Sequence, residues 1–164
     1  MITVAALLCL LCQETDKDKE REKMLKAPLD AMEKGIREGD EKLFKEQFHA
    51  EGYAKNLAGG SGLAGENVYK QGTRKKWFLK PDLAKAQVLG DGAAVIVPCE
   101  VWAWEKEKSV DQIELLLVKA EVKDGEKTKT VYVVLGGGEK RAQVEALANR
   151  FLKKEPLEPP KEEK

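Results

Sequence analysis

The second half of the chain contains four segments with strand character, and the connections between them are short. The connections are GDG at 90–92, the charged stretch EKEKS at 105–109 and KDG at 123–125. Glycine and aspartate adopt the positive φ angles that tight hairpins need. A connection between parallel strands needs a much longer crossover. The pattern therefore predicts an antiparallel meander with strands at 83–89, 93–104, 110–122 and 128–135.

Helices are predicted before this meander. Leu25, Leu29, Met32 and Ile36 recur at helical spacing, and we expect Pro28 near the first turn, where its missing N–H does no harm. This places the first helix of the domain directly before the glycine at position 39.

A helix corner follows. Gly39 ends the first helix, and Asp40 is expected to cap a second helix that carries Leu43, Phe44 and Phe48 on one stripe. A short strand at 53–57 and a weak helix at 63–77 are expected next.

The last part of the domain is predicted to be a glycine break and a helix. Three glycines at 136–138 are expected to break the last strand, and 139–154 reads as an amphipathic helix. The element order places the chain in the α+β class, with N-terminal helices, an antiparallel sheet and an added C-terminal helix.

The N-terminus carries an apolar run of 11 residues, ITVAALLCLLC at 2–12, followed at once by charged residues. A helix of this length is too short for a hydrocarbon core of about 30 Å. The run fits the apolar region of a signal peptide, although no basic residue precedes it and no small-x-small motif follows. Cys12 is a candidate for lipid attachment. Bacterial lipoprotein signals have a small residue directly before this cysteine, whereas this chain has Leu11. The alternative is a strand or helix end of the fold.

We therefore predict an exported protein, periplasmic or extracellular, whose only membrane contact is the leader. The predicted organisation is a leader at 1–12, a charged tether at 13–23, one domain at 24–154 and a disordered tail at 155–164. The C-x-x-C pair, Cys9 and Cys12, lies within the leader, so no redox role is expected. Cys99 would be the one cysteine of the mature chain, as a small buried apolar residue.

Charge and glycine patterns argue against two classes of ligand. The 29 basic residues balance 29 acidic ones, whereas nucleic acid requires clustered, uncompensated lysine and arginine. Gly60, Gly62 and Gly65 spell G-x-G-x-x-G, but no apolar parallel strand precedes them and no βαβ unit follows. We predict a flexible connection there, no cofactor and no nucleic acid.

The order of elements resembles the NTF2-like superfamily, which includes the SnoaL-like and ketosteroid isomerase-like proteins. The local matches are GDEKLFKEQFH at 39–49, similar to the Gly-Asp helix corner of those families, and the turn at Asp124 and Gly125. The resemblance covers about 25–135. It implies a curved sheet wrapped around a long helix, a cone-shaped pocket and often a homodimer. Tyr132 stands where many members have tryptophan, and the alternative fold is a cystatin-like helix on a sheet.

The strand at 93–104 supplies the candidate site. One face is aliphatic, whereas the other carries Glu100, Trp102 and Trp104 and is expected to line a cavity or meet a partner. Tyr53 and Tyr69 complete the predicted ligand-binding set as hydroxyl donors. If the protein is an enzyme, Glu100 among tryptophans is the candidate general base. The lone His49 has no companions at metal-ligand spacing, so no metal site is predicted.

These observations predict a binding module without catalysis, for a hydrophobic small molecule or a protein. The alternative is a pocket enzyme of the ketosteroid isomerase or SnoaL-like type, which moves a proton on a hydrophobic molecule.

Overall fold

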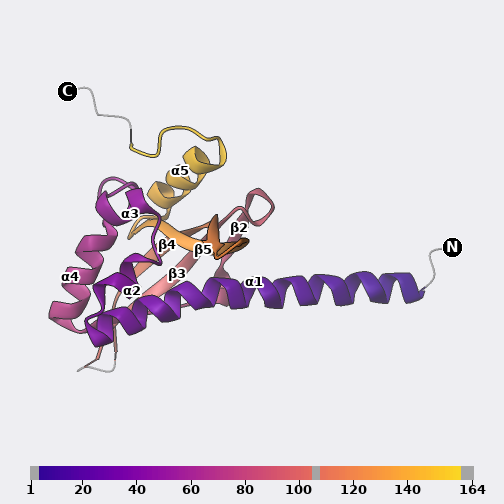
Figure 1. Ribbon diagram of the computed structural model, residues 1–164, viewed down its shortest axis with the longest axis horizontal. Coiled ribbons are helices and arrows are strands. Elements are labelled where there is room, and N and C mark those ends of the chain that lie inside the picture. Colours follow the sequence, from indigo (N-terminus) through magenta and orange to yellow (C-terminus); the bar gives the residue numbers. More distant parts are fainter. Residues whose placement is uncertain (1–3, 105–107, 160–164) are drawn as a thin grey trace.

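A computed structural model describes residues 4–104 and 108–159, with side chains from residue 16 onward (Figure 1). Helices come first, a β-sheet follows, and one further helix ends the domain. The helices are α1 (Val4–Glu38), α2 (Glu41–Lys45), α3 (Ala50–Ala54), α4 (Gly65–Lys75) and α5 (Arg141–Leu152). The strands are β1 (Trp77–Pro81), β2 (Gln87–Leu89), β3 (Ala94–Ala103), β4 (Lys108–Asp124) and β5 (Lys127–Gly138).

The sheet is antiparallel and strongly curled, so that it forms a half-barrel. Within the described residues its order is β1-β3-β4-β5, and β2 also pairs with β3. The turn at Gly90–Gly92 joins β2 to β3. The predicted α+β class and the meander from β2 to β5 are thereby confirmed.

Strand β1 lies partly where a helix was predicted. Helix α4 ends at Lys75, and Lys76 adopts the left-handed conformation with φ 52°. The chain turns there, and Trp77 pairs with Ala103 as the first residue of β1. A lysine in this conformation is uncommon, so residue type at position 76 does not predict the helix end.

Two shorter predicted strands were also wrong in part. Residues 83–85 form a 3₁₀ turn, and only Gln87–Leu89 pairs as a strand. Ala50–Ala54 is a helix, in which the backbone N–H of Tyr53 donates to the carbonyl of His49 at 3.0 Å. By contrast, the predicted cap is confirmed, because Asp40 Oδ1 accepts from the N–H of Leu43 at 2.9 Å.

Helix α1 runs for 35 residues without a break, and its N-terminal part extends beyond the other elements (Figure 1). The sequence placed Pro28 near a first turn, which is wrong, because Pro28 is a buried residue inside this helix. Proline removes one helical hydrogen bond, so packing must hold the helix together at this point. Among the helices that the structure describes, none combines the length and apolar character that crossing a membrane requires.

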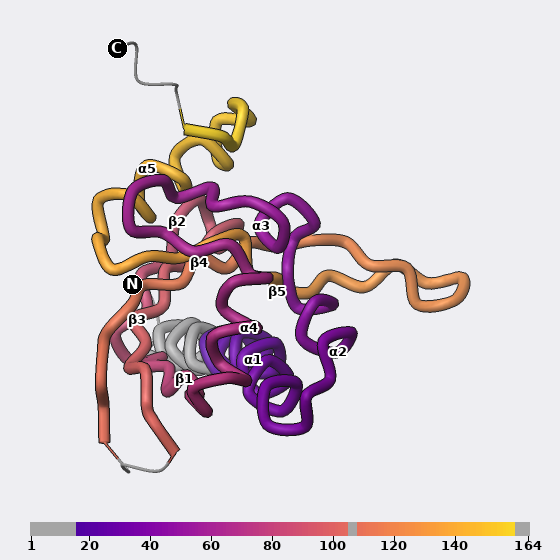
Figure 2. The backbone as a smooth tube through the Cα atoms, turned by 90° about the vertical axis from the view of Figure 1, so that its left-hand side faces the viewer, coloured from indigo at the N-terminus to yellow at the C-terminus, as the bar shows by residue number. Residues whose placement is uncertain are grey.

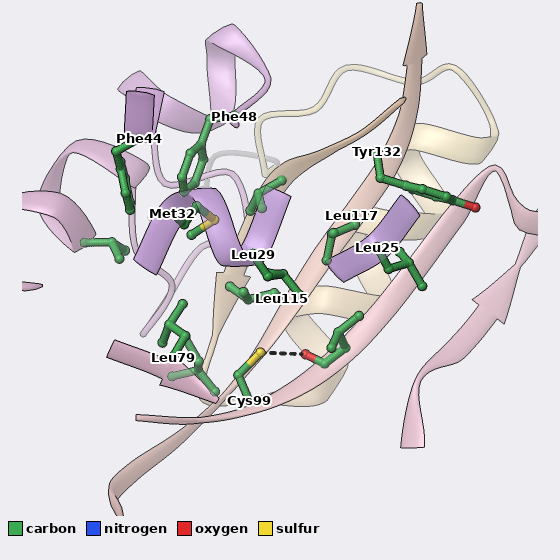
Figure 3. Close-up of a cluster of buried hydrophobic side chains, with 14 of the residues drawn as sticks. Leu25, Leu29, Met32, Phe44, Phe48, Leu79, Cys99, Leu115, Leu117 and Tyr132 are labelled. Atoms are coloured by element: carbon green, nitrogen blue, oxygen red, sulfur yellow. Dashed lines mark hydrogen bonds between the residues drawn. The ribbon is translucent and has the colours of Figure 1, made fainter. Parts of the chain in front are cut away.

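The C-terminal half of α1 lies across the inner face of the sheet. Leu25, Leu29, Met32 and Ile36 are each at most 4% exposed and belong to one apolar cluster with the inner-face residues of β3, β4 and β5. Figure 3 shows three of them close to Leu115, Leu117 and Tyr132. Figure 2 looks along α1 and shows the strands, α2 and α4 arranged around it. The predicted stripe of the first helix is confirmed.

The outer face of the sheet is covered by α5. Val144, Leu147 and Ala148 are fully buried against a second apolar cluster. The central part of the sheet is therefore buried on both faces, as in a three-layer arrangement. The sheet residues of this cluster are Ala94, Ile96, Leu116, Val118, Val133 and Leu135.

The glycines at 136–138 belong to β5, so the predicted break at this point is wrong. They pair with Glu114, Leu115 and Leu116 beyond a bulge in the β4–β5 ladder. A Cβ on Gly137 would lie 2.8 Å from the carbonyl oxygen of Glu114 and 2.7 Å from Leu115. These residues are glycines because neighbouring chain segments approach closely, and the strand continues through them.

The segment after α5 contacts the domain over its described part. Arg150 donates to the carbonyl oxygens of Leu57 at 2.8 Å and Leu157 at 3.2 Å, and Leu157 packs on the outer apolar cluster. Residues 160–164 of the predicted disordered tail lie outside the described residues.

Gly52 generates a stability prediction. A Cβ at this position of α3 would lie 2.1 Å from the backbone oxygen of Leu135, so Gly52→Ala must push α3 away from β5. We expect a loss of about 3 kcal/mol in the free energy of unfolding, measured by urea denaturation. The control is Gly125→Ala. The added Cβ has no atom within 4 Å, so the loss comes from the φ of +64° alone and should be about 1 kcal/mol in the free energy of unfolding. Equal losses for the two variants would contradict this account.

Candidate functional site

A cleft opens where the inner face of the sheet runs beyond α1. It has a volume of about 490 Å³ and lies between α4, the loop before it and the ends of β1, β3 and β4. We call it the concave cleft. Its lining consists of Leu63, Val68, Gln71, Lys75, Trp77, Leu79, Val101, Ala103, Val110, Asp111, Ile113 and Glu139.

The floor of the concave cleft is apolar because it is part of the inner core surface. Leu79, Val101 and Ile113 are each at most 9% exposed and belong to the same apolar cluster as α1. Val110 stands at the rim and is 47% exposed. A curved apolar floor of this kind can remove an apolar molecule from water.

The rim of the cleft is charged. Lys75 places its ammonium 5.2 Å from the centre of the Trp77 ring, whereas Asp111 and Glu139 supply carboxylates. Asp111 Oδ1 also accepts from the N–H of Gln112 at 2.8 Å. The cleft therefore combines an apolar floor with a few polar groups, the usual composition of a small-molecule site.

A narrower hollow adjoins the cleft near the glycines of β5. Leu63, Val68, Ile113 and Glu139 line both spaces. The hollow is bounded by Gly136, Gly137 and Gly138, together with Met32 and Phe48.

The predicted aromatic face of β3 forms a second, shallower depression, which we call the aromatic groove. Trp102 lies beside Phe78, its register partner on β1, with ring centres 6.3 Å apart. The Arg37 guanidinium lies 5.2 Å from the Phe78 ring centre and 5.1 Å from that of Trp104, and Lys80 Nζ lies 3.9 Å from that of Trp102. The lining of the groove is Arg37, Phe78, Lys80, Trp102, Ala103 and Trp104.

Glu100 lies on the same strand but lines a different, polar groove. Its Oε2 accepts a hydrogen bond from Trp102 Nε1 at 2.7 Å. The groove also holds Asp82, Lys85, Glu114 and Arg141, and none of its described lining residues is a tyrosine. Proton transfer between Glu100 and a tyrosine hydroxyl therefore has no support in the lining of this groove.

The structure places Tyr53 and Tyr69 in the helical layer. Tyr53 donates its hydroxyl proton to Glu41 Oε1 at 2.6 Å, and Tyr69 packs on Phe44 with ring centres 5.3 Å apart. Burial, followed by the hydrogen bond to Glu41, raises the pKa of Tyr53 above its usual range. The two tyrosines belong to the inner apolar cluster, whereas Trp102 and Glu100 line surface grooves, so the predicted ligand set does not form one site.

Sequence reasoning missed most of the concave cleft. Lys75 lies far along the chain from Val110 and Asp111, and it meets them only because the sheet curls toward α4. One signal was readable, since the aromatic and aliphatic run WFL at 77–79 is typical of a strand.

Among the residues with described side chains, no group of three or more histidine, cysteine, aspartate or glutamate residues is arranged to hold a metal ion. His49 begins α3, and its backbone N–H donates to the carbonyl of Val134 at 2.9 Å.

The structure is thus an α+β protein with a curled antiparallel sheet, and the concave cleft lies at the ends of β1, β3 and β4. Comparison with protein-family models, with curated proteins and with solved structures gave no match.

Cys99 generates a prediction about pH. The thiol is 3% exposed and contacts the carbonyl oxygen of Val97 at 3.6 Å, and burial raises its pKa from 9.0 to about 12. Between these values only the unfolded chain loses the thiol proton, so the free energy of unfolding should fall as the pH rises above about 9. Urea denaturation in a pH series measures this effect, with Cys99→Ala as the control that removes the thiol contribution. An identical alkaline slope for the two chains would show that the thiol is not held protonated.

Proposed function

We propose that this chain is a non-catalytic binding module that holds a hydrophobic small molecule in the concave cleft. The observation that carries the proposal is the apolar floor of Leu79, Val101 and Ile113, which lines a hollow of about 490 Å³ at the edge of the inner cluster.

We further propose that the fold is NTF2-like. The support is a long helix lying across the concave face of a curled sheet, together with the Gly39–Asp40 helix corner. A pocket at the open end of such a cone is what the resemblance implies. The same resemblance leads us to propose a homodimer. The apolar run at 2–12 leads us to propose an exported protein with a leader, in which Cys12 is the candidate for lipid attachment.

The choice of binding over catalysis rests on the chemistry of the lining. Asp111 and Glu139 stand at the rim, and the floor is aliphatic. A proton-transfer site needs a base and a donor directed at one reacting atom. Glu100, the candidate base, lies in a separate groove with its carboxylate bound to the Trp102 indole.

Val110 and Val122 provide a matched test, because both are valines of β4 that are 47% exposed, and only Val110 lines the cleft. Val110→Trp should narrow the cleft and weaken binding of the apolar dye 1-anilinonaphthalene-8-sulfonate at least about tenfold, because the indole occupies the volume that the dye needs. Val122→Trp should leave the affinity unchanged. Dye fluorescence measures both, and native mass spectrometry of the purified chain identifies any molecule already bound.

Equal weakening by the two substitutions would mean that the dye binds elsewhere. Full binding by the Val110→Trp variant would overturn the assignment of the concave cleft.

A further inference from the structure

The aromatic groove has a composition that the proposed small-molecule site does not explain. Each of its three rings lies within about 5 Å of a cation from a neighbouring element. Arg37 comes from the end of α1, Lys80 and Phe78 come from β1, and Trp102 and Trp104 come from the end of β3. The groove is separate from the concave cleft, since among the described residues the two linings have Ala103 alone in common.

The rings are held in place by the sheet. Phe78 and Trp102 are paired across β1 and β3, and their planes are inclined by 37°. The hydrogen bond from Trp102 Nε1 to Glu100 fixes the orientation of the indole. Rigid, half-buried aromatic surfaces of this kind offer contact area at a low cost in conformational entropy.

The cations can still bind a ligand. Arg37 forms one ion pair, with Glu33 at 2.6 Å through its NH2 atom, and its side chain is 52% exposed. A guanidinium carries five N–H donors, so this pair leaves donors for a further carboxylate. Lys80 rests its ammonium on the Trp102 ring at an exposed position. None of the described lining residues of the groove is acidic, and the carboxylates that contact them, Glu33 and Glu100, already accept from Arg37 and Trp102. The described lining itself therefore offers a ligand two cations, which favours an anion.

We propose that the aromatic groove binds a short acidic oligosaccharide. Lys80 and Arg37, which lie over Trp102 and Phe78 in the free protein, move off these rings to pair with the sugar carboxylates, and the sugar rings take their place on the aromatic faces. The apolar C–H face of a pyranose ring packs flat on an aromatic ring. An acidic oligosaccharide carries one carboxylate on each sugar. Two neighbouring sugars therefore present two negative charges, which the two cations of the groove can pair. This inference does not depend on the proposed function of the concave cleft.

Two other occupants fit less well. Nucleic acid requires a basic footprint, whereas this chain has no net charge and a pI near 6.6. A second copy of the chain, docked by the same groove, would bring Arg37 and Lys80 close to their own counterparts about a two-fold axis, and like charges repel.

The test uses a hexamer of galacturonic acid and its fully methyl-esterified form, which keeps the rings and removes the charges. Isothermal titration calorimetry on the full chain should show binding of the acid hexamer and at least about tenfold weaker binding of the ester. Trp102→Ala should weaken binding of the acid hexamer about tenfold or more, because a stacking surface is lost. Lys80→Gln should weaken it about threefold, and Lys129→Gln, an exposed lysine of β5, should have no effect.

Equal affinity for the acid and the ester would overturn the proposal, as would absence of binding at millimolar concentrations of the acid hexamer. Binding of an oligothymidylate that depends on Trp102, without binding of the uronate, would assign the groove to nucleic acid instead. A monomer–dimer equilibrium that Trp102→Ala abolishes, again without uronate binding, would assign it to self-association. Arg37→Gln serves as a second variant if Trp102→Ala does not fold. Binding of the dye in the concave cleft should be unchanged in all these variants, so the two sites can fail separately.

Discussion

The packing of α1 against the inner face of the sheet is the contact on which the rest of the structure depends. The apolar stripe from Leu25 to Ile36 fills the concavity of a sheet that curls around it (Figures 2 and 3). Each buried side chain of this size contributes roughly 2 kcal/mol by leaving water. The stripe also explains why a helix with Pro28 in its interior stays continuous, because the packing on either side of the proline offsets the lost hydrogen bond.

The same contact determines where ligands can reach the sheet. Helix α1 ends at Glu38, and the strands extend past this end of the helix. Helix α5 covers the outer face over the central part of the sheet. The ends of β1, β3 and β4 therefore extend past both layers. Their inner side chains, such as Val101, line the concave cleft, and their outer side chains, such as Trp102, line the aromatic groove. One alternating strand thus supplies both surfaces.

The meander, the apolar stripe of α1, the C-terminal helix and the cap at Asp40 were predictable, because hydrophobic period and turn chemistry are local properties. The predicted stripe of the second helix was wrong in part, because α2 ends at Lys45 and Phe48 lies beyond it. The misreadings share a different cause. The left-handed Lys76, the glycines at the end of β5 and the helix at Gly52 depend on contacts between segments distant in sequence. The candidate site divides in the same way: the pattern of β3 identified Trp102 and Trp104, whereas the concave cleft depends on the curl of the sheet. Tyr53 and Tyr69 were grouped with Glu100 by residue type alone, and the structure holds them in another layer.

Helix α1 covers one part of the inner face of the sheet, and the concave cleft is lined by another part near the ends of β1, β3 and β4. Methyl NMR of leucine, isoleucine and valine during titration with 1-anilinonaphthalene-8-sulfonate distinguishes these two parts of the face. Strands β3 and β4 each carry one methyl probe in the cleft lining and one probe away from the cleft. Val101 and Ile113 line the concave cleft, whereas Val95 and Leu117 are register partners further along the same face and are fully buried. The account predicts shifts at Val101 and Ile113, with Val95 and Leu117 unchanged. Shifts of equal size at all four residues, or at Val95 and Leu117 alone, would contradict it.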